Sequence, residues 1–192
     1  MIAVAPGVEG LIFDCDGTLV DSMPIHWECW HETFERFGAT CPHDFLERLK
    51  GVPTHGIIAA FNEKFGYDFD VEAFTEEKEN LAKKKLLHVK EIEPVTALVY
   101  KYHNKIPMAV ASGGPYETVK ISLDATGLSQ YFEVYITADD PVKPKPSPDI
   151  FLEAARRIGI APEKCQVYED ADMGVEAAVG AGMQYTDVRL YL

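Results

Sequence analysis

The sequence lacks any run of apolar residues close to the roughly 20 that a helix needs to cross a lipid bilayer. It is also poor in basic residues, with 18 Lys and Arg against 31 Asp and Glu and a net charge of −13. Nucleic acids and anionic membrane surfaces are bound through basic patches, so this charge balance argues against both as partners. An anionic ligand would need a local concentration of positive charge elsewhere in the chain.

Signatures of zinc fingers and of secretion are missing as well. The four cysteines contain no C-x-x-C pair: Cys15, Cys29, Cys41 and Cys165. They can be paired as two disulfides, but the N-terminal segment has no Lys or Arg and is interrupted by Pro6 and Gly7, unlike a secretory signal. We therefore expect free thiols in a cytoplasmic protein, and a monomer is the default expectation.

Short apolar stretches rich in β-branched residues alternate with helical periodicity. Four of them are predicted to be buried strands: Val8–Phe13, Pro107–Ala111, Val134–Ala138 and Cys165–Tyr168. Strands of this kind, separated by helices, predict an α/β fold with a Rossmann-like parallel sheet that is covered by helices on both faces.

One interval interrupts this alternation. From about Asp21 to Pro94 the pattern is almost purely helical, and helices are predicted over Thr54–Phe65 and Asp70–Val89. Insertions of this length between strands are often functional. We interpret residues 21–94 as an inserted all-helical cap domain and residues 1–20 and 95–192 as the α/β core domain. A larger single α/β domain with additional helices is the alternative.

A dense run of charges, Glu76 to Lys85, lies within the helical interval. Charge runs on helices are usually solvent-exposed, so we interpret this one as the solvated face of a helix.

The first predicted strand ends in two carboxylates, Asp14 and Asp16, followed by Gly17. Residues i and i+2 of an extended chain point the same way, so both can reach the crevice at the carboxyl end of the sheet. Two close carboxylates repel each other unless a cation joins them or one holds a proton. A nucleophile next to a general acid/base has this character, although an Asx turn at the end of a strand gives the same short pattern.

Two later segments could bind a phosphate. Ser112, Gly113 and Gly114 follow the second strand, where backbone N–H groups suit an anion, although such a sequence is also an ordinary turn. Lys145 lies between two prolines that stiffen its backbone, and it would supply the missing positive charge; Lys143 is the alternative, and both could simply be exposed.

A further acidic pair, Glu169 and Asp170, follows the last predicted strand. Carboxylate oxygens from Asp14 and Asp170 suit Mg²⁺, which binds through one or two carboxylates, water and a substrate phosphate. Glu169 could ligate the ion or orient a water that does, and Asp172 could cap the following helix.

Together these motifs resemble those of the haloacid dehalogenase-like hydrolase superfamily. The matches are FDCDGT at 13–18, ASG at 111–113, KPSPD at 145–149 and YEDADMG at 168–174, and the helical insertion resembles the C1 cap of that superfamily. The resemblance implies that Asp14 is the nucleophile and Asp16 the general acid/base. It also implies that Ser112 and Lys145 hold the phosphoryl group, and that Asp14, Asp170 and the backbone carbonyl of Asp16 ligate Mg²⁺.

Within the superfamily the chain resembles the β-phosphoglucomutase-like subgroup, especially its fructose-1-phosphatase-like branch. The residues that carry this likeness are DSMPIH at 21–26, GVPT at 51–54, EDAD at 169–172 and DVRL at 187–190. Mutases of the subgroup place an arginine in the cap close after Lys-Gly-Val, whereas this chain has Pro53 and Thr54 after Lys50-Gly51-Val52.

These features predict a Mg²⁺-dependent phosphatase that hydrolyses a small phosphorylated metabolite, a sugar phosphate, through an aspartyl-phosphate. In the cap, His26, Lys50 and Thr54 are expected to face the sugar, although His26 could instead pack on its helix. The alternatives are a β-phosphoglucomutase and, from a different class, a non-enzymatic phospho-acceptor signalling domain. A haloacid dehalogenase is disfavoured, since those enzymes lack the second aspartate that this chain has at Asp16.

Overall fold

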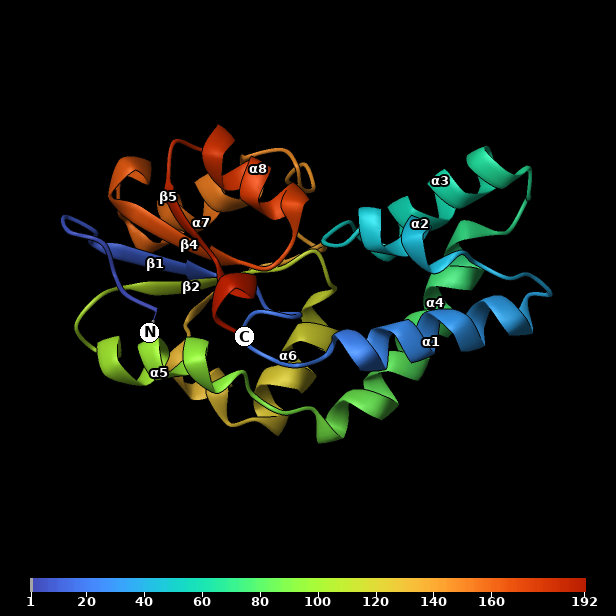
Figure 1. Cartoon of the computed structure of the whole chain (residues 1–192), viewed down its shortest axis with the longest axis horizontal. Helices are drawn as coiled ribbons and strands as arrows, with labels where there is room; N and C mark the ends of the chain where they lie inside the picture. Colours follow the sequence, from blue (N-terminus) through green and yellow to red (C-terminus); the bar gives the residue numbers. More distant parts are fainter. Residues whose placement is uncertain (1) are drawn as a thin grey trace.

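The computed structural model describes residues 2–192 and contains one parallel five-stranded sheet (Figure 1). Its strands are β1 (Gly10–Phe13), β2 (Met108–Ala111), β3 (Val134–Ile136), β4 (Cys165–Glu169) and β5 (Gln184–Asp187), in the order β3-β2-β1-β4-β5. Every residue of β1, β2 and β4 is buried, as expected for strands covered on both faces. The four predicted strands are therefore confirmed, most of them slightly shorter than predicted.

The fifth strand was not predicted. Strand β5 pairs in parallel with β4 at the edge of the sheet, and its residues Gln184, Tyr185, Thr186 and Asp187 are exposed or half-buried. This edge strand has no run of apolar residues, whereas such a run predicted each of the other four strands.

Side chains of the central strands alternate between two hydrophobic layers. In β1, Leu11 and Phe13 join one cluster while Ile12 joins the other. Helices α5 (Glu93–Tyr102) and α6 (Tyr116–Ala125) contribute to the first cluster. Helices α7 (Asp149–Ile158) and α8 (Asp172–Gly180) contribute to the second (Figure 1). The sheet is thus covered on both faces, and the carboxyl ends of its strands stay open to a ligand.

Helices also fill the interval between β1 and β2. They are α1 (Met23–Arg36), α2 (His43–Arg48), α3 (Thr54–Phe65), α4 (Val71–Lys85) and a 3₁₀ turn at Leu86–His88. Helix α3 has the predicted bounds. The predicted Asp70–Val89 helix begins one residue later, because Asp70 is the N-cap and accepts hydrogen bonds from Glu72 N and Ala73 N. We call residues 21–94 the helical segment.

The helical segment has a hydrophobic cluster of its own. It is built on aromatic rings, and the ring centroids of Phe34 and Phe61 are 4.5 Å apart, those of Phe34 and Phe74 4.8 Å. Every buried member of this cluster lies between Trp30 and Phe74, so none comes from the sheet or its helices. The outer part of the segment therefore has a core of its own, whereas Cys29, Leu81 and Leu86 join the first cluster of the sheet.

The chain enters and leaves the helical segment at one place. Val20 forms an antiparallel bridge with Glu91, Asp21 N donates to Lys90 O at 2.8 Å, and Ile92 N donates to Leu19 O at 2.9 Å. The two crossings run side by side, and the first of them lies only a few residues after Asp14 and Asp16.

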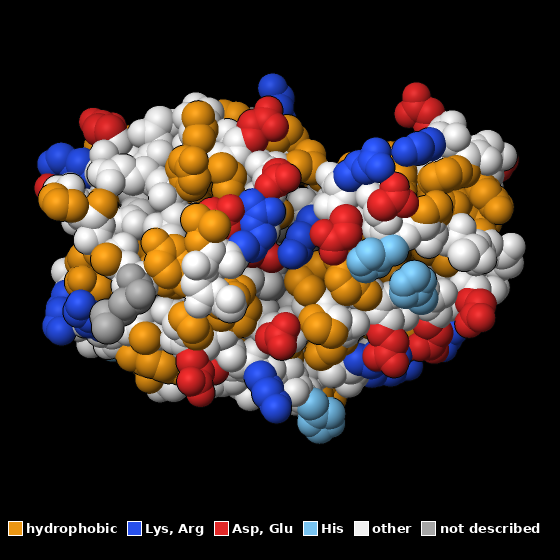
Figure 2. Space-filling view, in the orientation of Figure 1, with side chains coloured by type: hydrophobic (Ala, Val, Ile, Leu, Met, Phe, Trp, Pro, Cys, Tyr) orange, Lys and Arg blue, Asp and Glu red, His pale blue; other side chains and the backbone are white. Residues whose placement is uncertain are grey.

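In Figure 2, charged side chains gather where the helical segment meets the sheet portion. A pocket at this junction is lined by Arg48, Lys50, Asp172 and Arg189, among others. Within residues 2–192, none of the helices has the length and apolar character needed to span a membrane.

The separate aromatic cluster makes a stability prediction. Phe61 is 1% exposed in its centre, whereas Phe65, one turn later in α3, is 38% exposed. Phe61→Ala should lower the free energy of unfolding by about 3–5 kcal/mol, because it leaves a cavity between rings. Phe65→Ala, the matched control, should cost only about 1 kcal/mol. Urea unfolding followed by circular dichroism measures both, and equal losses would contradict the assignment of Phe61 to the centre of the cluster.

Candidate active site

Carboxylates from two neighbouring strands meet at the open edge of the sheet. Strands β1 and β4 are paired with Phe13 opposite Tyr168, and Asp14 N donates to Tyr168 O at 3.0 Å. This register brings Asp14, Glu169 and Asp170 together: an oxygen of each lies within 4.8 Å of an oxygen of the other two, and all three are buried. Residues that are far apart in the sequence thus form one acidic cluster.

A buried lysine lies inside this cluster. Lys145 Nζ donates to Asp14 Oδ1 at 2.6 Å and to Glu169 Oε2 at 2.7 Å, and it lies 5.2 Å from the centre of the Phe151 ring. Burial disfavours the ammonium, but the two carboxylates outweigh this effect and hold the pKa of Lys145 above its ordinary value. Lys145 is therefore a positive charge held in place, as its flanking prolines predicted.

Glu169 is held from both sides. Its Oε1 accepts hydrogen bonds from Asp170 N at 3.1 Å and Ala171 N at 3.0 Å, while its Oε2 accepts from Lys145. An ionised carboxylate has about four lone-pair sites, and three are occupied here. These contacts suit a residue that positions Lys145 better than one that mainly ligates a metal.

The acidic cluster has three carboxylates but only two lysines in contact with them, Lys145 and Lys50. Burial, followed by the charge of Glu169, raises the pKa of Asp14 well above its ordinary value, with Lys145 opposing the shift. The same two causes raise the pKa of Asp170 to about 6, with Lys50 opposing. Buried like charges of this kind are stabilised when a divalent cation binds between them.

The turn after β1 is shaped around Asp170. Gly17 has φ +84°, and a Cβ atom there would lie 2.1 Å from Asp170 Oδ2, so only glycine fits. Thr18 Oγ1 lies 3.5 Å from the other oxygen, Asp170 Oδ1. The site thus combines hard oxygen donors, excess negative charge and a close backbone turn, and it fits a Mg²⁺ ion.

Asp16 belongs to a separate hydrogen-bond network. Its Oδ1 accepts from Ser22 Oγ at 2.6 Å and lies 3.1 Å from His26 Nε2. Burial opposes ionisation of Asp16, but the charge and hydrogen bond of His26, the hydrogen bond of Ser22 and the charge of Lys78 outweigh it, so its pKa lies below the ordinary value. The two aspartates of the first motif therefore have pKa values shifted in opposite directions.

The loop after β2 closes another side of the site. Ser112 N donates to Ile136 O, and Gly114 N donates to Ser112 Oγ at 3.0 Å. Gly113 meets the helical segment: a Cβ atom there would lie 2.3 Å from the carbonyl oxygen of Gly51. Two backbones therefore touch where the sheet portion and the helical segment meet.

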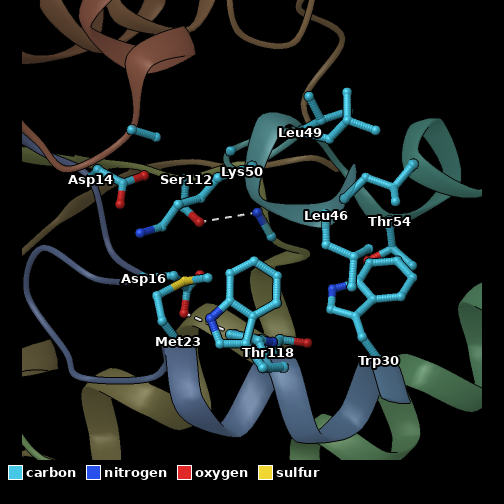
Figure 3. Close-up of a pocket in the computed structure, with 18 of the residues that line it drawn as sticks. Asp14, Asp16, Met23, Trp30, Leu46, Leu49, Lys50, Thr54, Ser112 and Thr118 are labelled. Atoms are coloured by element: carbon cyan, nitrogen blue, oxygen red, sulfur yellow. Dashed lines mark hydrogen bonds and ion pairs between the residues drawn. The ribbon is translucent and has the colours of Figure 1, made fainter. Parts of the chain in front are cut away.

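The cavity between these parts includes all three residues predicted to face a sugar, and Figure 3 shows two of them. Asp14 and Ser112 lie on one side, Trp30 and Thr54 on the other, and Lys50 reaches between them. His26 also lines the cavity, but through its contact with Asp16. Lys50 Nζ is 2.6 Å from Asp170 Oδ2, so it lines the cavity while it pairs with the acidic cluster. Thr54 Oγ1 donates to Glu79 Oε1 at 2.5 Å.

Two further cavity residues, Lys78 and Glu79, come from the run interpreted above as a solvated helix face, and that interpretation is wrong for both. They are 4% and 6% exposed, respectively. Phe74, Lys78 and Ala82 are spaced four residues apart on α4 and are all buried. Their helical spacing indicates that Lys78 lies on the buried face, although the charged composition of the run suggests exposure. The side chains of Lys78 and Glu79 both line the cavity between the sheet portion and the helical segment.

Comparisons with known proteins agree with this geometry. Residues 11–188 match the family model described as haloacid dehalogenase-like hydrolase. Fructose-1-phosphate phosphatase YqaB of Escherichia coli is 39% identical over 94% of this chain and 96% of its own length, and a phosphorylated carbohydrates phosphatase of Thermotoga maritima is 30% identical over 92% and 83%. The crystal structure of a beta-phosphoglucomutase from Clostridium difficile superposes with a TM-score of 0.82 at 25% identity, over 93% of this chain and 83% of that one.

The contact between Lys50 and Asp170 makes a prediction for metal binding. The ammonium of Lys50 pairs with a carboxylate of the acidic cluster that could hold Mg²⁺, so Lys50→Met should tighten Mg²⁺ binding. A partly exposed pair of this kind contributes about 1 kcal/mol, which corresponds to about a fivefold lower dissociation constant. Isothermal titration calorimetry measures the change without relying on activity.

Lys84→Met is the matched control, since Lys84 lies exposed on the same segment and its loss removes the same charge. An unchanged or weaker affinity in Lys50→Met would show that Lys50 does not compete with the cation.

Proposed function

The chain belongs to the haloacid dehalogenase-like hydrolase family and acts on phosphate monoesters, and we propose that it is a Mg²⁺-dependent phosphatase for a sugar phosphate. One observation carries the proposal: Lys145, buried between Asp14 and Glu169 at the carboxyl end of the sheet, holds a carboxylate beside the cavity. Fixed positive charge next to a carboxylate is what an attack on an anionic ester requires.

Asp14 is the nucleophile in this proposal. One of its oxygens attacks phosphorus, the bond from phosphorus to the sugar oxygen breaks, and an aspartyl-phosphate forms. Lys145 holds Asp14 Oδ1 at 2.6 Å, so the side chain is oriented before substrate binds. Water then attacks the phosphorus of the intermediate, which releases inorganic phosphate and restores Asp14.

Asp16 is the general acid and base. It protonates the departing sugar oxygen and later takes a proton from the attacking water. Its pKa is depressed without substrate, so it begins as a carboxylate held by Ser22 and His26. A phosphate dianion nearby opposes that charge, so substrate binding shifts Asp16 toward the protonated form that the first step needs.

The transferring phosphoryl group is bound by Ser112, the N–H of Gly113 and Lys145. Asp14, Asp170 and the backbone carbonyl of Asp16 would hold Mg²⁺, with Glu169 fixing Lys145 and orienting a bound water. When bound, Mg²⁺ neutralises the phosphate charge that would otherwise repel Asp14.

Residues 21–94 act as a cap domain on the α/β core of residues 1–20 and 95–192. The aromatic cluster of the segment and the paired crossings at Val20 and Glu91 support this division. The cap encloses the leaving group and excludes bulk water, and it brings His26 and Thr54 into the cavity.

Two features favour hydrolysis over transfer to a second sugar. The named relatives at 30% identity or more include phosphatases for fructose 1-phosphate and for phosphorylated carbohydrates. In addition, within residues 2–192 no arginine lines the cavity, whereas a mutase has to hold a second phosphate there.

Removing the nucleophile tests the mechanism. Asp14→Asn keeps the size of the side chain but removes its nucleophilic carboxylate, so release of phosphate from p-nitrophenyl phosphate should fall by a factor of about 10⁴ or more. Asp21→Asn is the control, because Asp21 is an exposed aspartate close to the same motif. Thermal unfolding checks that both variants are folded. Substantial activity in a folded Asp14→Asn variant would rule out this nucleophile.

Removing the metal tests its role and leads to the substrate. Dialysis against EDTA should abolish phosphate release, because without the cation the clustered carboxylates repel the phosphate of the substrate. Added Mg²⁺ should restore the activity. The restored enzyme is assayed for inorganic phosphate with a panel of sugar phosphates and short organic phosphates. Full activity in EDTA would contradict the metal role, and a preference for non-sugar phosphates would contradict the substrate class.

A further inference from the structure

Glu79 places a buried negative charge on the helical side of the cavity. It lies on α4, is 6% exposed, and is hydrogen-bonded to Thr54, which Figure 3 shows on the side away from Asp14. Nothing in the proposed chemistry at phosphorus uses this carboxylate. A buried carboxylate lowers stability unless it is well paired, so Glu79 needs hydrogen-bond partners in the cavity wall.

Three donors from three helices hold the carboxylate. Oε1 accepts from Thr54 Oγ1 at 2.5 Å and from Lys78 Nζ at 2.9 Å, and Oε2 accepts from Thr118 Oγ1 at 3.1 Å. Burial opposes its ionisation, but Lys78, Thr54 and His26 outweigh burial and keep the pKa of Glu79 below its ordinary value. The group is therefore a carboxylate in a fixed orientation.

One acceptor site of Glu79 is left for a ligand. Among the described residues, Oε1 has two hydrogen-bond donors and Oε2 has one, out of about four lone-pair sites in all. The remaining lone pair on Oε2 can accept a hydrogen bond from a hydroxyl group. It cannot accept anything from a phosphate dianion or a carboxylate, which carry no proton to donate.

The nearby positive charges are already paired. Lys78 Nζ is shared by Glu79, by His26 Nδ1 at 3.3 Å and by the face of the Trp30 ring at 5.2 Å. Lys50 is paired with Asp170 at the other end of the cavity. A second anionic group on the substrate would thus approach Glu79 without an unpaired lysine to meet it.

We infer that Glu79 determines specificity, binding a hydroxyl of an uncharged leaving group and rejecting substrates that carry a second phosphate or a carboxylate. This inference rests on the proposed function. It narrows the substrate to the monophosphate of a neutral polyhydroxylated compound, and like-charge repulsion is the means of rejection.

Matched pairs of substrates test the inference. Fructose 1-phosphate and fructose 1,6-bisphosphate differ by a second phosphate, and glucose 6-phosphate and 6-phosphogluconate differ by a carboxylate. The wild type should prefer the neutral member of each pair in kcat/KM by about tenfold or more, as expected for a buried like charge. Inhibition of p-nitrophenyl phosphate hydrolysis by each compound measures the same preference as binding.

Glu79→Gln keeps the shape of the side chain and removes its charge, which also frees Lys78 to meet an anion. This variant should reduce the kcat/KM ratio between the neutral and the anionic member of each pair by about tenfold, mainly through a lower KM for the anionic member. Glu76→Gln, on an exposed position of the same helix, should leave the preference unchanged.

The outcomes separate the inference from the function beneath it. Equal use of both members by the wild type would overturn the role of Glu79 while leaving the phosphatase intact. So would a Glu79→Gln variant that loses the same factor on every substrate, because that result indicates a structural role. If the wild type releases phosphate from none of these compounds nor from p-nitrophenyl phosphate, the proposed function fails and the inference falls with it.

Discussion

The site depends on one buried ammonium. Lys145 joins Asp14, directly after β1, to Glu169 at the end of β4, and without it two carboxylates would face each other in a buried region. Removing one partner of such a buried group leaves an uncompensated charge, so the lysine supports the ends of both strands as well as the site. Burial and the charge of Glu169 raise the pKa values of Asp14 and Asp170. Lys145 and Lys50 offset this effect only in part, so the cluster still needs positive charge.

Much of the sheet portion could be predicted from sequence, because buried parallel strands are short apolar runs whose ends carry the functional side chains. The strand ends at Asp14, Ser112 and Asp170 follow from this rule. The edge strand β5 escaped it, since exposure on one side allows a polar composition. Lys145 was found from its prolines, but its two carboxylate partners depend on strand order, which no local pattern contains.

The helical segment was harder to read. Its helices followed from period, yet the cavity residues of α4 were hidden in a run of charges, where Lys78 and Glu79 look like their solvated neighbours. Their burial depends on packing against α1, α3 and α6, a tertiary fact. Lys50 was correctly expected near the site, but its pairing with Asp170 required knowing how closely the segment approaches β4.

The contact between Gly51 and Gly113 bears on how this protein can change over evolution. Because main chain meets main chain there, this contact does not depend on which side chains line the cavity. Cavity residues can then diverge toward new substrates without disturbing this contact. A methyl group on residue 113 would lie 2.3 Å from the carbonyl oxygen of Gly51, so it would act as a spacer that widens the gap between the two parts and admits water to the cavity.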